Sequence, residues 1–285
     1  MRRNLAERLS ADDWYVPMLK LCIELVNQPD GRPTDQSTLD LVDAHALAKK
    51  ATIHLISLRR MCEAVPPAAY PAYTPLPSEG PIDHSSASVL LRAAFETYLT
   101  LSLLYLRSDN EELRCRRISW KIGGLQYRQG LEPLHELDIR KRAGEAHKLE
   151  GLLGVLTASA YFRALNHKRR EKLKAGDWKF GLSWLDLAEM AGFNRHLFQK
   201  IYGYLCAYAH SSYLTVVQIS SASNQQDQRF LADFVLHMAL PLMAKLILQY
   251  PRLFPESMSL CHCSPFAFRA ARIHDPLPAH YPDRN

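Results

Sequence analysis

The sequence lacks the short motifs by which several classes of enzyme are recognised. It contains no glycine-rich phosphate loop, no G-x-S-x-G nucleophile elbow, no dinucleotide-binding fingerprint and no H-E-x-x-H pair. Each of these motifs holds a reactive group or a phosphate in one fixed local geometry. Their absence argues against nucleotide-cofactor enzymes and serine hydrolases, and we expect no cofactor.

The sequence also lacks internal repeats, low-complexity segments and any strand-like alternation of useful length. Its first residues, MRRNLAERLSADDW, contain no apolar stretch of the kind that a secretory signal needs. Six cysteines are scattered along the 285 residues, as is usual for reduced thiols. These features predict a cytoplasmic protein.

Two segments are apolar over a length that could span a membrane, 87–106 and 230–250. The first carries Arg92 and Glu96, and the second carries Asp233 and Lys245 together with a histidine and a proline. Charges at the middle of a lipid-facing helix are costly, so we expect two buried core helices and no membrane partner. The exposed part of the second helix is suited to a contact in a homodimer.

Helical spacing of apolar residues predicts an all-α fold, with a single helical bundle of about eight helices in one domain spanning 1–285. The expected core is 12–250, interrupted by a long Pro-rich loop over 65–81. The segment 251–285 is predicted to be an irregular tail. Expected helix caps are Ser85 or Ser86, Asp109 and Asn194.

The chain has a formal net charge of +6, from 35 basic and 29 acidic residues. We expect the excess to be spread over many helices, which is compatible with RNA or another phosphate-rich ligand without requiring one. The segment RALNHKRREKLK (163–174) is either a cationic stripe or a solvated helix face. The aromatic residues beside it are either a base-stacking platform or core: Trp178, Phe180, Trp184 and Phe193.

One group of residues has the side-chain types that a catalytic site needs. Arg92 and Glu96 are four residues apart in an apolar helix, so they lie on one face and must be satisfied by each other, by a third polar group or by a ligand. A later helix offers that group, because Tyr202, Cys206 and His210 recur every four residues in an otherwise apolar stretch. We expect the arginine, carboxylate and histidine to meet at the centre of the bundle.

Such a trio fits two functions. Arginine binds phosphate through two hydrogen bonds, and histidine exchanges protons near neutral pH, so the trio is competent for phosphate chemistry. The same residues also form an ordinary buried hydrogen-bond network that fixes how two helices cross. In that case the protein is a non-catalytic interaction module. A metal-dependent hydrolase is disfavoured because Glu96 and His210 alone are too few ligands.

The segments 90–106 and 184–216 resemble a widespread bacterial family of unknown function. In that family a helix with R-x-x-x-E precedes, by about a hundred residues, a helix reading Y-x-x-[SC]-x-x-x-H-x-[ST]. The corresponding residues here are Arg92, Glu96, Tyr202 or Tyr204, Cys206, His210 and Ser212. The resemblance implies binding roles for Tyr202, Cys206 and Ser212, although Cys206 stands where serine is more usual.

Helical bundles of this kind are loosely similar to the HEPN superfamily, which includes metal-independent ribonucleases of defence and toxin–antitoxin systems. That similarity implies a nucleic-acid-directed defence or stress protein. His210 would be the acid or base, Arg92 would hold phosphate, and Glu96 would orient one of them. The HEPN signature, an arginine and a histidine with four to six residues between them, occurs here only at chance frequency and never at His210. Arg92 would therefore have to come from another helix.

The residues Cys261, His262 and Cys263, with His274 and His280 further on, are of the types that bind zinc. A single residue between the two cysteines is tighter spacing than zinc sites normally use. We therefore predict no metal site.

Overall fold

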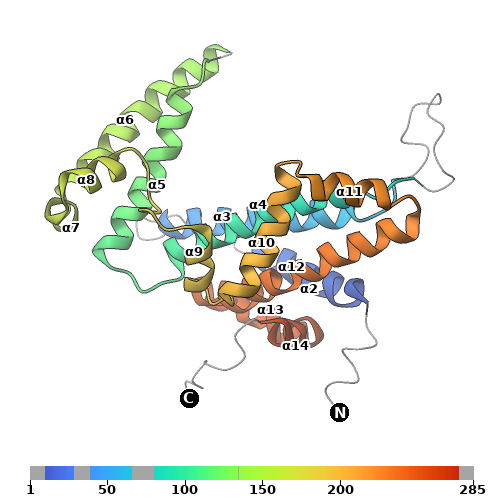
Figure 1. The fold of residues 1–285 in the computed structure, drawn as a ribbon. Helices are drawn as coiled ribbons and strands as arrows, with labels where there is room; N and C mark the ends of the chain where they lie inside the picture. The colour runs from blue at the N-terminus through green and yellow to red at the C-terminus, as the bar shows by residue number, and fades with distance from the viewer. Residues whose placement is uncertain (1–9, 29–38, 66–79, 134, 276–285) are drawn as a thin grey trace. The chain divides into compact units, whose positions relative to one another are not determined.

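The computed structural model describes residues 10–28, 39–65, 80–133 and 135–275, and over these residues the fold is all-helical without strands (Figure 1). The helices are α2 (Ala11–Asn27), α3 (Leu39–Met61), α4 (His84–Tyr105), α5 (Glu111–Gln129), α6 (Glu136–Ala158), α7 (Ala160–Ala164), α8 (His167–Lys174), α9 (Trp184–Met190), α10 (Arg195–Ala209), α11 (Tyr213–Ser221), α12 (Gln225–Leu253), α13 (Met258–Cys263) and α14 (Pro265–His274). The all-α prediction is confirmed. The predicted count of about eight is wrong, because the described residues form 13 α-helices.

Part of the excess arises over 136–174, where the chain forms three helices, α6, α7 and α8. Ser159 ends α6 and begins α7, and its Oγ accepts the backbone N–H of Phe162 at 3.4 Å. Asn166 begins α8, and its Oδ1 accepts the N–H of Arg169 at 3.0 Å. Short polar side chains that bond the backbone in this way interrupt a helix and start another.

The C-terminal tail was predicted to be irregular, and this is wrong through residue 274. A short 3₁₀ turn (Pro255–Ser257) leads into α13 and α14. Pro265 is tolerated because it occupies the first turn of α14, where its missing N–H is not needed. Three alanines on α14 are buried, and the Trp14 ring of α2 stacks on Phe266 with 5.6 Å between centroids. The segment 255–274 is therefore part of the core.

Two of the predicted caps are displaced by one or a few residues. Asn110, not Asp109, caps α5, and Asp83, not Ser85 or Ser86, accepts the N–H of the first turn of α4. Asp109 instead pairs with Arg117 at 2.6 Å. Asn194 caps α10 as predicted, accepting the N–H of Leu197 at 2.9 Å.

The chain divides into two compact units, one formed by Met1–Ser102 with Ala188–Asn285 and one by Leu103–Leu187. We call them the discontinuous unit and the inserted unit. Whether they fold as the single domain expected from the sequence stays a prediction. Most of the expected Pro-rich loop, 66–79, lies outside the described residues, as does the end of the tail, 276–285.

The discontinuous unit packs around α12, against which α2, α3 and α14 lie. Helices α4 and α12 are long and apolar enough to cross a membrane, but 72% and 67% of their apolar windows are buried inside the structure. Burial of this extent is what core helices show, because the apolar face that lipid would cover is already covered by protein.

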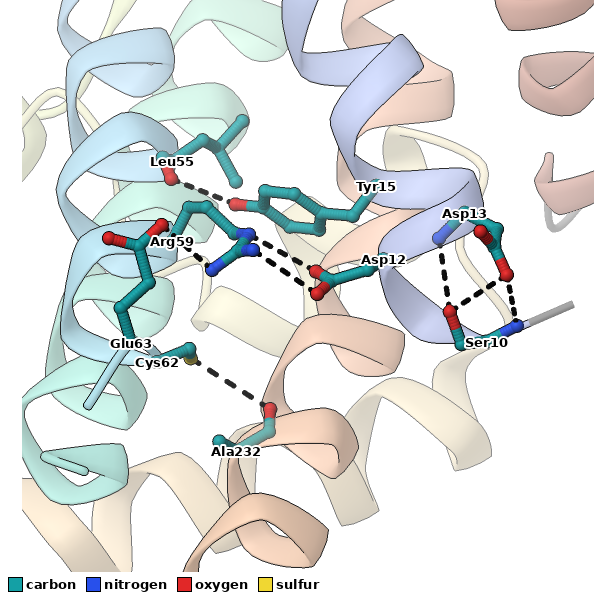
Figure 2. A network of polar contacts seen from close by, with 9 residues as sticks. All are labelled: Ser10, Asp12, Asp13, Tyr15, Leu55, Arg59, Cys62, Glu63 and Ala232. Atoms are coloured by element: carbon teal, nitrogen blue, oxygen red, sulfur yellow. Dashed lines mark hydrogen bonds and ion pairs between the residues drawn. The ribbon is translucent and has the colours of Figure 1, made fainter. Parts of the chain in front are cut away.

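Polar contacts at one end of α2 join it to α3, and Cys62, which follows α3, donates to the carbonyl oxygen of Ala232 on α12 (Figure 2). Arg59 of α3 contacts both carboxylate oxygens of Asp12 at 3.1 Å. The fully buried Tyr15 donates its hydroxyl to the carbonyl oxygen of Leu55 at 2.8 Å. Burial raises the pKa of this tyrosine well above its ordinary range. The hydrogen bonds from Arg59 Nη2 to Asp12 and from Tyr15 to Leu55 pair polar atoms that burial of the α2–α3 contact would otherwise leave unpaired.

The inserted unit has a small core of its own, formed by Cys115, Ile122, Leu156, Phe162 and Leu173. Gly123 of α5 lies against Gly176, whose φ is +81°. A Cβ on Gly176 would come within 2.3 Å of the Gly123 Cα. Both glycines are therefore required for close packing here, and α5 runs through Gly123 without a break.

Lys245 of α12 and Asp275 at the end of α14 form a buried ion pair in the discontinuous unit. Their side chains are 2% and 5% exposed, and Nζ lies 2.9 Å from Oδ1. The ammonium group also lies over the ring of Phe193. Desolvating both charges is costly, so removing one partner leaves a buried charge uncompensated.

We predict that Asp275→Asn lowers the free energy of unfolding by roughly 3–5 kcal/mol. The control is Glu189→Gln, which removes the pair with Arg195, whose side chains are 58% and 44% exposed. That change should cost less than about 1 kcal/mol. Urea unfolding followed by circular dichroism measures both. Equal effects would show that the buried pair does not hold the C-terminal helix.

Candidate functional site

Helix α4 carries the arginine and the carboxylate of the site. Its Leu91, Phe95 and Leu99 are buried, which turns Arg92 and Glu96 to the edge of the core. Arg92 Nε donates to Glu96 Oε1 at 3.0 Å. The pair is therefore satisfied within one helix turn, as the four-residue spacing predicts.

Helix α10 adds Tyr202, which binds the same carboxylate. Its hydroxyl donates to Glu96 Oε1 at 2.6 Å, and the Arg92 guanidinium lies over its ring at 5.5 Å. Burial, and then the bond to Glu96, raises the pKa of Tyr202, so the phenol stays protonated and remains a donor. Burial alone would lower the pKa of Arg92, but hydrogen bonds with Tyr202 and Glu96 outweigh it and the pKa is raised.

His210 contacts the arginine, with Nε2 3.3 Å from Arg92 Nη1. An arginine has no acceptor, so in this hydrogen bond Nε2 carries the lone pair and the imidazole proton is on Nδ1. Nε2 is the nitrogen that a neutral histidine uses as a base. Arg92, Glu96, Tyr202 and His210 thus form one connected set, which we call the Arg–His site.

The location of His210 differs from the expectation. It was predicted deep inside the bundle, but it is exposed and forms the C-cap of α10, where the helix ends. The side chains of Arg92 and Glu96 are 23% and 27% exposed. The Arg–His site therefore lies at the surface of the discontinuous unit, open to solvent. The helix ends early because Ser211 adopts a φ of +49° that no α-helix continues through.

The turn after His210 is strained. Ser211 is not a glycine, and its left-handed conformation is unusual for a serine. Ser212 then begins α11, its N–H donating to the carbonyl oxygen of Ala207 at 3.0 Å, while its own hydroxyl is buried without a hydrogen-bond partner. Cys206 contributes its carbonyl oxygen, which accepts the His210 N–H at 3.0 Å.

The structure distinguishes the two candidate tyrosines. Tyr204 donates to Tyr208 at 3.4 Å, and Tyr208 donates to Gln218 Oε1 at 2.8 Å. The ring of the buried His84 stands edge-on to Tyr208, with 5.9 Å between centroids. Tyr202 therefore serves the Arg–His site, and Tyr204 belongs to a second network. Sequence reasoning missed this second network; the four-residue spacing of Tyr204 and Tyr208 was its one visible signal.

Among the described residues no group of three histidine, cysteine or acidic side chains is placed to hold a metal ion. The candidate zinc residues lie on α13, where Cys261 is buried and Cys263 is exposed. Side chains two residues apart on a helix point in nearly opposite directions, so the two thiols do not converge. His280 lies outside the described residues.

The positive charge is not spread over the chain as expected. The inserted unit, 103–187, contains 17 basic and 11 acidic residues, a net charge of +6, whereas the remainder has 18 of each. Most of this excess lies in 163–179, with seven basic and two acidic residues. Arg163, Lys168 and Arg169 are exposed, and we call these three the basic surface.

Aromatic side chains accompany the basic surface within the inserted unit. Arg169 lies over the ring of Phe180 at 5.3 Å, and Lys179 lies over Trp184 at 4.4 Å. Trp178 and Trp184 are partly exposed and meet edge to face. Phe193, by contrast, is core and packs against Phe95. Of the four aromatics considered from the sequence, Phe180 and Trp184 lie under positive charge, Trp178 contacts Trp184, and Phe193 is core, while Phe180 also packs against the core of its unit.

These features define an all-helical protein with a solvent-open polar site shared by two helices, R-x-x-x-E on one and tyrosine and histidine on the other. A family model described as "Family of unknown function (DUF5677)" matches residues 78–227, more than half of the chain. The chain belongs to this family. No curated protein and no solved structure matches it. The matched region contains the whole Arg–His site and the whole inserted unit.

Proposed function

We propose that this protein binds RNA and cleaves it without a metal ion at the Arg–His site. The observation that carries the proposal is the contact between Arg92 Nη1 and His210 Nε2, at 3.3 Å and open to solvent. A cation that binds phosphate thus stands beside a base whose lone pair accepts a hydrogen bond from that cation. The pKa of Arg92 and of Tyr202 is raised, so Arg92 stays charged and Tyr202 stays protonated at neutral pH.

Each side chain has a distinct role in this proposal. Arg92 uses Nε for Glu96 and Nη1 for His210, and its remaining N–H donors serve the phosphate oxygens. Glu96 fixes the guanidinium, and Tyr202 fixes Glu96 in turn. When the phosphate draws the guanidinium toward itself, His210 Nε2 is released to accept a proton. Charge developing on the phosphate is stabilised by Arg92.

The reaction is an internal transfer of the phosphodiester. His210 Nε2 takes the proton of the ribose 2′-hydroxyl, the 2′-oxygen forms a bond to phosphorus, and the bond from phosphorus to the 5′-oxygen breaks. Water protonates the departing 5′-oxygen. The products are a 2′,3′-cyclic phosphate and a 5′-hydroxyl, and no oxidant or second substrate is needed. The same chemistry, in a cytoplasmic defence or stress role, is what the loose sequence resemblance to HEPN ribonucleases implies.

The choice of RNA as the partner is supported by the inserted unit. Its net charge of +6 in 85 residues equals that of the whole chain. Single-stranded nucleic acids bind where positive charge is interleaved with aromatic rings on which bases stack. Phe180 supplies such a ring under Arg169 of the basic surface, and Trp184, which meets Trp178, supplies one under Lys179.

The competing interpretation is an interaction module in which the Arg–His site has only a packing role. A site that only specifies packing would be sealed beneath apolar side chains. Here His210 is exposed, and Arg92 and Glu96 are about a quarter exposed. The geometry therefore favours a site that meets a ligand.

We predict that purified wild-type protein cleaves RNA in the presence of a chelator and that His210→Ala lowers the rate by about 10²–10⁴-fold, the usual contribution of an acid or base. The control is His237→Ala, which removes another exposed histidine of the same unit. RNA fragments are read on gels and their ends by phosphatase sensitivity. Both variants should keep the wild-type melting temperature. No cleavage by the wild type, or equal cleavage by both variants, would contradict the proposal.

A separate prediction concerns binding by the basic surface. The triple variant Arg163→Gln, Lys168→Gln, Arg169→Gln should bind single-stranded RNA more weakly, and the salt dependence of binding should fall by roughly 0.7 for each phosphate that these side chains neutralise. Fluorescence anisotropy in the His210→Ala background avoids cleavage. The control removes the same charge from the discontinuous unit, at the exposed Lys20, Lys49 and Lys50. Equal weakening by both triple variants would mean that only net charge matters.

A further inference from the structure

Helix α11 exposes its apolar residues instead of burying them. Five large apolar side chains are 42–81% exposed, namely Tyr213, Leu214, Val216, Val217 and Ile219. Only Thr215 is buried within the helix, and its hydroxyl is satisfied by the carbonyl oxygen of Ser212. A helix of this composition normally forms part of a core. Here it faces outward over both of its turns.

Further exposed apolar side chains lie on the first turns of α12, which follows α11 in the chain (Figure 1). Phe230 is 73% and Phe234 is 46% exposed, and Phe234 packs edge-on against Tyr204 with 5.3 Å between centroids. Gln228 joins the two helices by donating to the carbonyl oxygen of Ala222 at 3.3 Å. We call α11 with Phe230 and Phe234 the apolar face.

The apolar face is large enough to form the centre of a protein–protein interface. An aromatic side chain presents about 150–250 Å² when fully exposed, so Tyr213, Phe230 and Phe234 alone offer roughly 300–500 Å². The four aliphatic side chains add to this. Patches on monomeric proteins rarely exceed about 300–600 Å², and a stable dimer buries roughly 800 Å² on each partner. The apolar face thus supplies the centre of an interface of standard size.

The lack of charge on α11 indicates which kind of partner fits the apolar face. No lysine, arginine, aspartate or glutamate occurs from residue 201 to residue 226, so α11 is uncharged, while the exposed Asp227, Arg229 and Asp233 lie on the first turns of α12. Nucleic acid would require positive charge, and helices that lie on membranes carry lysine or arginine on their polar face. A charged protein partner would require complementary charge. An uncharged apolar surface is complementary to another copy of itself, and two-fold dimers bury the same patch on both subunits.

We propose that the apolar face is the interface of a homodimer, in which α11 and the first turns of α12 pack against the same elements of a second copy. His210, Ser211 and Ser212 form the turn that leads into α11, so the interface begins three residues from His210. Burial of α11 therefore fixes the turn on which His210 is held. The dimer proposal is independent of the proposed RNA cleavage, because it rests only on the composition and exposure of the apolar face.

The test is the mass of the full chain in solution, measured by light scattering after gel filtration over a range of concentrations. Wild-type protein should have about twice the 32.5 kDa mass of the chain. The variant Val216→Glu, Ile219→Glu should have the mass of one chain, because two charges per subunit would be buried in a dry interface. The matched control is Ile53→Glu on α3, since Ile53 and Ile219 are 51% and 52% exposed. It should stay dimeric.

Circular dichroism and the melting temperature distinguish loss of the dimer from loss of the fold. The double variant should keep wild-type helicity, while its melting temperature should no longer rise with protein concentration. A wild-type protein that is monomeric at tens of micromolar overturns the proposal. So does a double variant that remains dimeric. Flotation of wild-type protein, but not the double variant, with vesicles of phosphatidylcholine and phosphatidylglycerol would assign the face to a membrane and also overturn it.

Discussion

A charged pair in an apolar helix is the constraint on which the site depends. Arg92 and Glu96 cannot enter the core without partners, because an uncompensated buried charge costs several kcal/mol. The fold meets this requirement by placing the pair at the edge of the core and by bringing Tyr202 to the carboxylate and His210 to the guanidinium. These contacts hold α4 against α10, and the side chain of Arg92 remains partly exposed to solvent. The contacts that pair these two charges therefore also leave the Arg–His site open to solvent.

The end of α10 joins the site to the apolar face. Ser211, in a left-handed conformation, stops the helix at His210 and starts α11 two residues later. If α10 continued, His210 would remain in a helix interior and α11 would point elsewhere. The same turn therefore exposes the histidine and leaves the uncharged α11 at the surface. The inserted unit contributes something different, since all of the net positive charge of the chain lies there.

Much of this arrangement could be predicted from the sequence. The all-α class, the cap at Asn194, and the pairing of Arg92 with Glu96 follow from spacing and side-chain chemistry, which act over a few residues. The exposure of His210 could not be predicted, because apolar neighbours in the sequence indicated burial, and the break at Ser211 has no glycine to signal it. The C-terminal helices were missed because prolines were counted as breakers, although Pro265 occupies a permitted first turn. The contact between α4 and α10 joins residues more than a hundred positions apart, which local patterns cannot specify.

The central claim is that Arg92 and His210 together form a phosphate site, and side-chain nitrogen NMR of ¹⁵N-labelled protein tests it directly. At mildly alkaline pH His210 should be the Nδ1–H tautomer, with an unprotonated Nε2. Addition of uridine 3′-monophosphate should shift the His210 nitrogen signals in the wild type. The shift should be abolished in Arg92→Gln, while His237 should stay unchanged in both. An absence of any shift in the wild type, or an equal shift in the variant, would contradict a phosphate site built from these two residues.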